Sequence, residues 1–507
     1  MNNYVLNAFE SKKLDEISIK KFKIDGIVLM ENAGAKTADW LMHDILKKDE
    51  KILIVAGAGN NAGDGFVVAR HLLNNNYDVD VLLMTAMSKY KGDALKNLDI
   101  LKHLNCNLLK FKENNKNIKE KYTFLVDAVF GVGLSREIEG KFKSVIEEMN
   151  NSGASILSVD IPSGINASTG EIMGVCVKAD YTATYGTLKL GHLFSSEYCG
   201  DLSLFDISFP KQAIELFDIE PAKLITPEFV KQLMPHRKAD SHKYQNGNLL
   251  LIGGSHGKSG AIILSAKAAF RSGVGIATAI TTIGQESIVN ASLDELMVVG
   301  LLDELGINTE NFTIFKEFLK KKTAVVFGPG IVKNETIFNL LTFLVRMENI
   351  PLVIDADGLN LISESGKNIF YDLKDREIVL TPHIAEFSRL TRKSVAEIEK
   401  NKIEIAVKYA VEHGVTLVLK GKNTIIASKG GDVYVNNKGN AGMATAGSGD
   451  VLSGIIGAYL SRGLTAFKSA VVSVYLHALS GDISAEKTSC DFMNAGDIIE
   501  NLKEIEL

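Results

Sequence analysis

Cysteine, proline and tryptophan are scarce in this chain of 507 residues, which has 4, 8 and 1 of them. The cysteines are widely separated and form neither a zinc-binding spacing nor a disulfide framework, which indicates a reducing compartment. No apolar run approaches the length of a membrane span, and the polar, charged first 22 residues indicate no secretory signal. These absences exclude a disulfide-rich secreted protein and a helical membrane protein, and we expect a cytoplasmic location.

An excess of charge of one sign is also absent. The 56 Lys and Arg against 61 Asp and Glu give a formal net charge of −5, and 46% of the residues are hydrophobic. This balance does not favour a nucleic-acid or membrane-surface partner. We expect small-molecule substrates and a soluble homo-oligomer. Each subunit should have two or more domains, because the chain is too long for one ordinary domain.

The few prolines mark a domain boundary. Half of them, Pro210, Pro221, Pro227 and Pro235, fall within one short stretch. Proline breaks helices and central strands, so this stretch predicts a boundary near residue 220. We therefore predict two domains, covering residues 1–218 and 222–507.

Short apolar runs alternate with helical patterns on both sides of this boundary, which is typical of buried, mostly parallel sheets. Both domains are therefore predicted to be α/β. The strands expected in the first domain lie at 51–59, 78–84, 122–131 and 155–164. Those of the second lie within 248–254, 275–281, 323–330, 351–358, 377–383 and 416–422.

Three strand ends of the first domain carry polar groups: GAGNNAGDG (57–65), Asp127 with GVGLSRE (131–137), and Asp160 with Pro162-Ser163-Gly164. Ligands of open α/β sheets bind beyond the carboxyl ends of strands. For each aspartate taken alone, helix capping and a role in a site are about equally good explanations. Three polar strand ends in one sheet favour a shared site. GAGNNA matches a loose dinucleotide pattern, yet the second strand is not followed by the acid that binds a ribose, so an ordinary dehydrogenase is not favoured.

In the second domain, Gly447-Ser448-Gly449-Asp450 precedes a long apolar helical pattern. A helix N-terminus offers free N–H groups and a positive dipole end, which suit phosphate. A carboxylate beside bound phosphate would be repelled unless it had a chemical role. The alternative is a simple N-cap, for which aspartate is well suited.

The motifs of the first domain resemble those of the NAD(P)H-hydrate epimerases: MENAG (30–34), NNAGDGFVVAR, VDAVFGVGLSRE and VDIPSGINASTG, in this order. The resemblance covers roughly residues 5–215 and implies a Rossmann-like three-layer α/β/α fold that binds hydrated NAD(P)H and K⁺. It implies Asp160 as the acid–base residue and Asn61, Asp127 and Ser163 as K⁺ ligands. The hydrate would be bound by Asp160 and by Asn60, Asn61, Ala62, Gly63, Asp64, Gly131, Val132, Gly133, Leu134, Ser135, Arg136 and Glu137. Ala62 stands where the family usually has glycine, and a positive φ there would strain it.

From about residue 225 onward the chain resembles the ADP-dependent NAD(P)H-hydrate dehydratases, which have a ribokinase-like α/β fold. FGPG (327–330), DADGLN (355–360), LTPHIAE (380–386), LKGKNTIIA (419–427) and GSGD (447–450) carry the resemblance. It implies ADP as co-substrate with Mg²⁺, and Asp450 as the general base. Nucleotide would be bound by Lys420, Gly421, Lys422, Asn423, Thr424 and Gly449, and the hydrate by Ala261, Gly330, His383 and Asp450. Ile384 and Ala385 replace the family's usual proline and glycine.

Together the resemblances predict a bifunctional enzyme of nicotinamide nucleotide repair: the epimerase recycles the epimer that a stereospecific dehydratase cannot use. Two alternatives stay open. The first is a vitamin or sugar kinase fused to a regulatory nucleotide-binding domain, which keeps Asp450 as the base. The second is a non-enzymatic first domain that senses a ligand or binds a partner.

Overall fold

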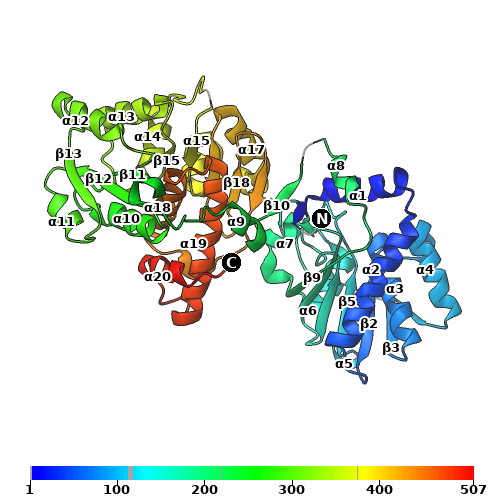
Figure 1. The fold of residues 1–507 in the computed structure, drawn as a ribbon. Helices are drawn as coiled ribbons and strands as arrows, with labels where there is room; N and C mark the ends of the chain where they lie inside the picture. The colour runs from blue at the N-terminus through cyan, green and yellow to red at the C-terminus, as the bar shows by residue number, and fades with distance from the viewer. Residues whose placement is uncertain (1–2, 112–117, 219, 374) are drawn as a thin grey trace. The chain divides into compact units, whose positions relative to one another are not determined.

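A computed structural model describes residues 3–111, 118–218, 220–373 and 375–507 (Figure 1). The chain forms two compact units, Met1–Ala222 and Lys223–Leu507. No helix in the described ranges is long and apolar enough to cross a membrane. Each unit is considered separately below.

The first unit is built on a parallel sheet of seven strands in the order β4-β3-β2-β5-β6-β7-β9. The predicted strands correspond to β2, β3, β5 and β6, whereas β4, β7 and β9 were not predicted. The bounds are β2 Lys51–Ala56, β3 Asp78–Leu83, β4 Asn107–Lys110, β5 Phe124–Ala128, β6 Ser155–Val159, β7 Tyr181–Tyr185 and β9 Asp201–Phe205. Two short strands, β1 (Tyr4–Leu6) and β8 (Leu188–Lys189), pair in parallel.

Helices cover both faces of this sheet, because alternate residues of its strands are apolar on opposite sides. On β2, Ile52 and Ile54 belong to one buried cluster and Leu53 and Val55 to another. The first cluster contains residues of α2 (Gly26–Trp40), α3 (Asn60–Asn74) and α4 (Gly92–His103), and the second those of α5 (Ile118–Lys121) and α6 (Gly140–Asn150). The predicted three-layer fold is therefore confirmed. The other helices are α1 Ala8–Lys20, α7 Leu190–Phe194 and α8 Gln212–Glu215.

The second unit has a longer sheet in which ten strands follow the order β13-β12-β11-β14-β15-β16-β17-β18-β19-β10. All neighbours are parallel except β17–β18 and β18–β19. All six predicted strands are present, as β11, β12, β14, β15, β16 and β17. The bounds are β10 Ala222–Leu224, β11 Asn248–Ile252, β12 Ile276–Thr282, β13 Met297–Leu302, β14 Ala324–Phe327, β15 Leu352–Ile354, β16 Ile378–Leu380, β17 Thr416–Leu419, β18 Ile425–Ala427 and β19 Val433–Val435.

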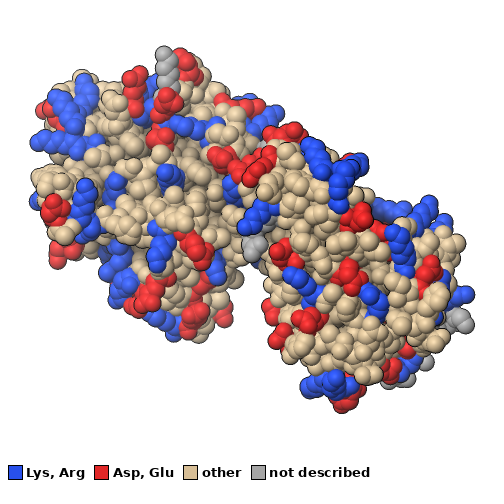
Figure 2. All heavy atoms as spheres, turned by 45° about the vertical axis from the view of Figure 1, so that its right-hand side comes forward, with Lys and Arg blue, Asp and Glu red and all other residues tan. Residues whose placement is uncertain are grey.

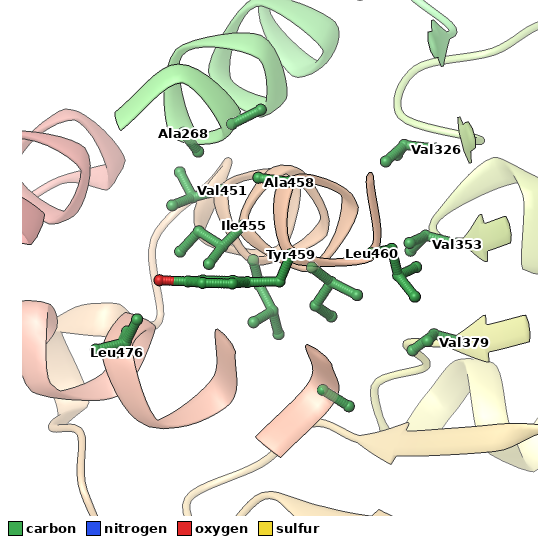
Figure 3. Close-up of a cluster of buried hydrophobic side chains, with 14 of the residues drawn as sticks. Ala268, Val326, Val353, Val379, Val451, Ile455, Ala458, Tyr459, Leu460 and Leu476 are labelled. Atoms are coloured by element: carbon green, nitrogen blue, oxygen red, sulfur yellow. The ribbon is translucent and has the colours of Figure 1, made fainter. Parts of the chain in front are cut away.

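The helix that follows GSGD lies in the centre of the core of this unit. Figure 3 shows Val451, Ile455 and Leu460 of α18 (Ser448–Ser461) among side chains from the sheet and neighbouring helices. Every residue from Val451 to Ser461 is buried, so the start of α18 is held firmly in position. The remaining helices are α9 Pro227–Leu233, α10 Ser259–Arg271, α11 Glu286–Asn290, α12 Thr309–Leu319, α13 Glu335–Arg346, α14 Asp357–Ser365, α15 Ile384–Thr391, α16 Val395–Lys400, α17 Lys402–His413, α19 Ala466–Thr488 and α20 Ala495–Asn501.

Acidic and basic side chains are interspersed on the visible face of each unit, without an extended patch of one sign (Figure 2). This distribution agrees with the balanced composition and gives no electrostatic footprint for nucleic acid on that face.

Candidate active sites

The sheet order of the first unit brings the three polar strand ends together, because β2, β5 and β6 are neighbours. A cavity of about 590 Å³ lies at this edge. Its lining includes most of the predicted hydrate-binding residues, namely Asn60, Asn61, Asp64, Gly131, Val132, Gly133, Leu134, Ser135, Arg136 and Asp160. Ala62, Gly63 and Glu137 lie outside the lining.

Ala62 adopts an ordinary helical conformation within α3 and is fully buried. It is not among the non-glycine residues of positive φ in the described chain. The alanine at this position therefore introduces no backbone strain.

Asp160 directly follows β6 and is held in an unusual conformation. Its φ is 65°, in the left-handed region that costs a non-glycine residue energy. Lys189 Nζ donates a hydrogen bond to Asp160 Oδ1 at 2.5 Å, and Thr184 Oγ1 donates to the same oxygen at 3.5 Å. His192 Nε2 lies 2.9 Å from the Asp160 carbonyl oxygen. Side chain and backbone of Asp160 are thus both fixed.

His192 is neutral in this arrangement. Its Nδ1 accepts the backbone N–H of Lys189 at 3.0 Å, which leaves the proton on Nε2 to be donated to Asp160. Burial, reinforced by the charge of Lys189, lowers the pKa of His192 to about 4. The histidine therefore has a structural role near neutral pH.

Two further carboxylates line the same cavity. Burial raises the pKa of Asp64 well above its usual range, and the charges of Asp160 and Asp15 add to this effect. Burial and the charge of Asp160 also raise the pKa of Asp15 to about 6. The cavity therefore contains, close to Asp160, two acids whose pKa values are raised above their usual range, and perturbed acids of this kind gather at sites of acid–base chemistry.

Asp127 and Ser163 lie behind this cavity and support its wall. Asp127 is fully buried and accepts hydrogen bonds from Ser163 Oγ at 2.6 Å and from the Ser163 N–H at 2.8 Å. Ser163 Oγ also accepts the N–H of Phe130 at 2.7 Å, at the start of the 130–136 loop. Burial raises the pKa of Asp127, and the hydrogen bonds from Ser163 oppose this shift.

These oxygens suit a hard monovalent cation. Asn61 adds to the set, since its Nδ2 is buried and has no hydrogen-bond partner in the described part of the chain. Rotation of that amide would present its oxygen in place of the nitrogen. The Asn61 amide also approaches Gly131 closely, because a Cβ added there would lie 2.9 Å from Asn61 Oδ1. The residues therefore fit the K⁺ site that the resemblance implies.

Asp450 of the second unit occupies the third position of α18, and the helix is capped by Gly447 instead. Gly447 has a φ of 88°, and no side chain caps this end. The simple N-cap hypothesis for Asp450 is therefore wrong. Burial, together with the charge of Asp355, raises the pKa of Asp450 to about 7, while Lys420 acts in the opposite direction. A carboxylate with a pKa near neutrality is suited to act as a general base.

Lys420 lies beside the start of α18 and is held there by Asp355. Lys420 Nζ donates to Asp355 Oδ1 at 3.0 Å, and Ser453 Oγ donates to Asp355 Oδ2. A Cβ added to Gly449 would lie 3.1 Å from Lys420 Nζ, so the backbone at the start of α18 lies close to this ammonium group. A cation and the free N–H groups of a helix start are thus adjacent, which favours a phosphate.

His383 is brought to the same edge through the backbone. It forms an isolated parallel bridge with Lys420 and caps α15, with its Nδ1 accepting the Ala385 N–H at 3.1 Å. Burial and the charge of Lys420 lower the pKa of His383. The cap is intact with Ile384 and Ala385 in place of the family's usual residues.

Ala261 and Gly330 form a second group. A Cβ on Gly330, whose φ is 63°, would lie 3.3 Å from the Ala261 Cβ and 2.6 Å from the carbonyl oxygen of Lys258. Lys258 Nζ in turn donates to Asp357 Oδ2 at 2.9 Å, and the charge of Asp357 acts on Asp450. This ion pair links the two groups of predicted hydrate-binding residues.

The predicted nucleotide-binding segment Lys420–Thr424 joins β17 to β18. Thr424 Oγ1 donates to the Gly421 carbonyl at 3.1 Å, which closes the turn. Gly421 and Lys422 are exposed, and Asn423 and Thr424 are half-buried.

Several residues of these sites were not predicted from the sequence. In the first unit they are Asp15, Lys189 and His192, and in the second Lys258, Asp355, Asp357 and Ser453. The segment GTLKLGH directly follows β7, so the strand-end rule that found Asp160 could also have found Lys189. Asp15 lies on a helix outside the sheet, and only its folded position places it in the cavity.

Two family models match the chain. NAD(P)H-hydrate dehydratase matches residues 249–504, and YjeF-related protein N-terminus matches residues 26–191. The bifunctional NAD(P)H-hydrate repair enzyme Nnr of Moorella thermoacetica is 35% identical over 510 residues, covering 98% of this chain and 96% of that protein. The enzyme of the same name from Thermofilum pendens is 36% identical over 496 residues, covering 96% of this chain and 93% of that protein.

Two solved structures are similar to part of this chain. An ADP/ATP-dependent NAD(P)H-hydrate dehydratase from Bacillus subtilis, co-crystallised with ATP and Mg²⁺, is 27% identical with a TM-score of 0.49, covering 55% of this chain and 96% of that chain. A ribokinase-like superfamily protein from Enterococcus faecalis is 28% identical with the same TM-score of 0.49, covering 55% of this chain and 94% of that chain.

The two units and their sites define an α/β protein in which each unit has a mostly parallel sheet and an acidic site of its own. The chain belongs to the family of bifunctional NAD(P)H-hydrate repair enzymes. The family predicted from the motifs is thereby confirmed, and the kinase alternative is not favoured.

Proposed function

We propose that the first unit interconverts the R and S epimers of hydrated NADH and NADPH, and that the second unit dehydrates the S epimer with ADP, giving AMP and phosphate. One observation carries this proposal. A single chain of this family has two acidic sites, with Asp160 in a cavity of the first unit and Asp450 at a helix start beside a lysine in the second.

In the second unit, Asp450 takes the proton of the hydrate's hydroxyl group as that oxygen attacks the β-phosphorus of ADP, and AMP leaves. The N–H groups of α18 and the Lys420 ammonium stabilise the charge of the transferred phosphoryl group. Phosphate is a much better leaving group than hydroxide, so the C–O bond then breaks with help from the ring nitrogen. Loss of the neighbouring ring proton restores NAD(P)H.

Mg²⁺ fits this site as a companion of the nucleotide. Magnesium prefers oxygen ligands and is often held by one or two carboxylates together with substrate phosphates. Asp450 offers such oxygens, as does Asp357, whose Oδ2 is paired with Lys258, while Asp355 is paired with Lys420. When bound, the ion would neutralise phosphate charge.

In the first unit, inversion at the carbon that bears the hydroxyl group requires a bond of that carbon to break and re-form, and Asp160 takes up and returns the proton that moves in this step. The network of Asp127 and Ser163 holds the wall against which the substrate binds. We propose that K⁺ binds Asn61, Asp127 and Ser163 and stabilises this wall. Replacing K⁺ with tetramethylammonium should lower both the epimerisation rate and the melting temperature of the unit. Unchanged values for both would remove the ion from the proposal.

The proposed function is tested by incubating the protein with each purified hydrate epimer, with and without ADP. We expect interconversion without ADP, and full recovery of NADH absorbance at 340 nm only with ADP. Formation of a stable phosphorylated product without NADH would instead support a kinase. Lack of interconversion would support a binding role for the first unit.

We also propose that residues 1–218 and 222–507 fold independently, each carrying one activity, since each unit has its own sheet and core. Fragments with these limits should be soluble and cooperative in thermal unfolding. Aggregation of both fragments would argue against these limits. The homo-oligomeric state and the cytoplasmic location stay predictions, and size-exclusion chromatography with light scattering tests the first of them.

A further inference from the structure

Lys189 is the most completely engaged cation of the first unit's site. Its side chain is 5% exposed. Its ammonium group donates to Asp160 Oδ1 at 2.5 Å, to Thr184 Oγ1 at 2.8 Å and to the Tyr185 carbonyl at 3.2 Å. An ammonium has three N–H groups, so all three are used and none is left for a substrate.

The backbone of Lys189 is fixed as firmly as its side chain. It lies on β8, paired with Leu6 of β1, and its N–H bonds to His192, which also bonds to the Asp160 carbonyl. Lys189 and Asp160 are therefore connected twice, once through their side chains and once through His192.

This arrangement leaves one Asp160 oxygen available. Oδ1 accepts from both Lys189 and Thr184, whereas Oδ2 receives no hydrogen bond from the described residues. Asp160 lines the cavity, so Oδ2 is the oxygen that can meet a substrate proton.

Several other titratable or charged groups line the cavity beside Asp160. Asp15 and Asp64 face the same space, and a nearby carboxylate makes ionisation of another more costly. Tyr185 also lines the cavity, its hydroxyl bonded to Thr37, while Lys12 and Arg136 line it without a bond to Asp160 among the described residues. Among these cations, Lys189 is the one in direct contact with Asp160.

We propose that Lys189 is a positioning residue for epimerisation, which fixes the Asp160 side chain through Oδ1 and leaves Oδ2 available in the cavity. This inference rests on the proposed epimerase activity of the first unit. Lys189 acts through Asp160 and does not touch the substrate.

The test compares Lys189→Met, Lys189→Arg and Lys121→Met with the unmodified protein. Lys121 is a matched control, because its Nζ donates to the buried Asp80 at 2.8 Å in the same unit but outside the cavity lining. The readout is the pH dependence of the epimerisation rate, with melting temperature as the folding measure.

We expect Lys189→Met to lower kcat at pH 7 by roughly tenfold to a hundredfold and to move the acid limb of the pH–rate profile upward by at least about one pH unit. Lys189→Arg should restore part of the rate and of the profile, since the cation is retained. Lys121→Met should leave the profile in place even if the melting temperature falls. A Lys189→Met protein with a normal profile would overturn the proposal.

A double variant keeps the proposal testable if Lys189→Met alone fails to fold, because Asp160→Asn removes the charge that would be left unpaired. If Lys189 acts through Asp160, Lys189→Met/Asp160→Asn should be no slower than Asp160→Asn and more stable than Lys189→Met. A further rate loss in the double variant would show an independent role and contradict the proposal. Absence of epimerisation by the unmodified protein would instead refute the proposed function.

Discussion

The two units each place an aspartate at the carboxyl edge of a parallel sheet, but they control its charge differently. Asp160 lies in direct contact with the Lys189 ammonium, in a strained backbone conformation after a strand. Asp450 lies on the first turn of a helix, and the nearby Lys420 is paired with a different carboxylate, Asp355. Burial therefore raises the pKa of Asp450 to about 7.

The difference matches the chemistry proposed for each site. A nucleotide brings several negative charges, so its site needs a cation and N–H groups that are not consumed by the base. The hydrate's reacting carbon brings no charge of its own, so a dedicated lysine can hold the acid–base group. One residue type thus serves two reactions through its surroundings.

The largest expected effect is the loss of epimerisation in Asp160→Asn. The amide keeps the shape of the side chain but cannot accept the proton, and a general base contributes about 10²–10⁴-fold. ADP-dependent dehydration of the S epimer should be unaffected. Separate assays of the two activities on one preparation provide the check, and a loss of less than tenfold would reduce Asp160 to a structural role.

Asp450→Asn should give the opposite pattern, lowering dehydration at least about a hundredfold and sparing epimerisation. ADP affinity should be kept or improved, because a negative charge beside the phosphates is removed. These effects are measured as the turnover rate and as ADP binding by calorimetry. The melting temperature is the folding control. Near-normal turnover would contradict the assignment of Asp450 as the general base.

The dehydration rate should depend on pH through Asp450. The base must be deprotonated, so kcat/KM should fall as pH drops below about 7, approaching tenfold per pH unit. The free energy of unfolding should depend on pH in the opposite direction to that of a salt-bridged acid. Because the pKa of Asp450 is raised in the folded state, the protein loses stability as pH rises through about 7 and this group becomes charged. Asp450→Asn should therefore melt higher than the unmodified protein at pH 8. A rate that is flat from pH 5.5 to 7 would contradict the assignment.

The smallest expected effect concerns Ala62, where the family usually has glycine. Ala62→Gly removes a buried methyl group and adds backbone freedom inside α3, which should destabilise the first unit by about 1–2 kcal/mol. Epimerisation should change by less than a few-fold, because Ala62 lies outside the cavity lining. Denaturant unfolding of the 1–218 fragment measures the change, and increased stability would mean that glycine suits this position better.

Sequence alone determined most of the central strands and the motifs at their ends, but not β4, β7 and β9 of the first unit. Buried parallel strands are short apolar runs, and β2, β5 and β6 are recognisable for that reason. The same rule placed Asp127 and Asp160 at a shared edge, because parallel neighbours end together. GSGD before an apolar helix likewise located the start of α18.

Only the tertiary structure decided how these groups are paired. Lys189 lies 29 residues from Asp160, and Lys420 lies 65 residues from Asp355. No local pattern fixes such separations, because they depend on how intervening loops and helices close. Asp15 reaches the cavity from α1, outside the sheet, and Asp450 is not a cap because Gly447 takes that place. Sequence therefore determined which chemical groups are present at the strand and helix ends, and tertiary packing decided which of them are charged, since burial and neighbouring charges exist only in the folded chain.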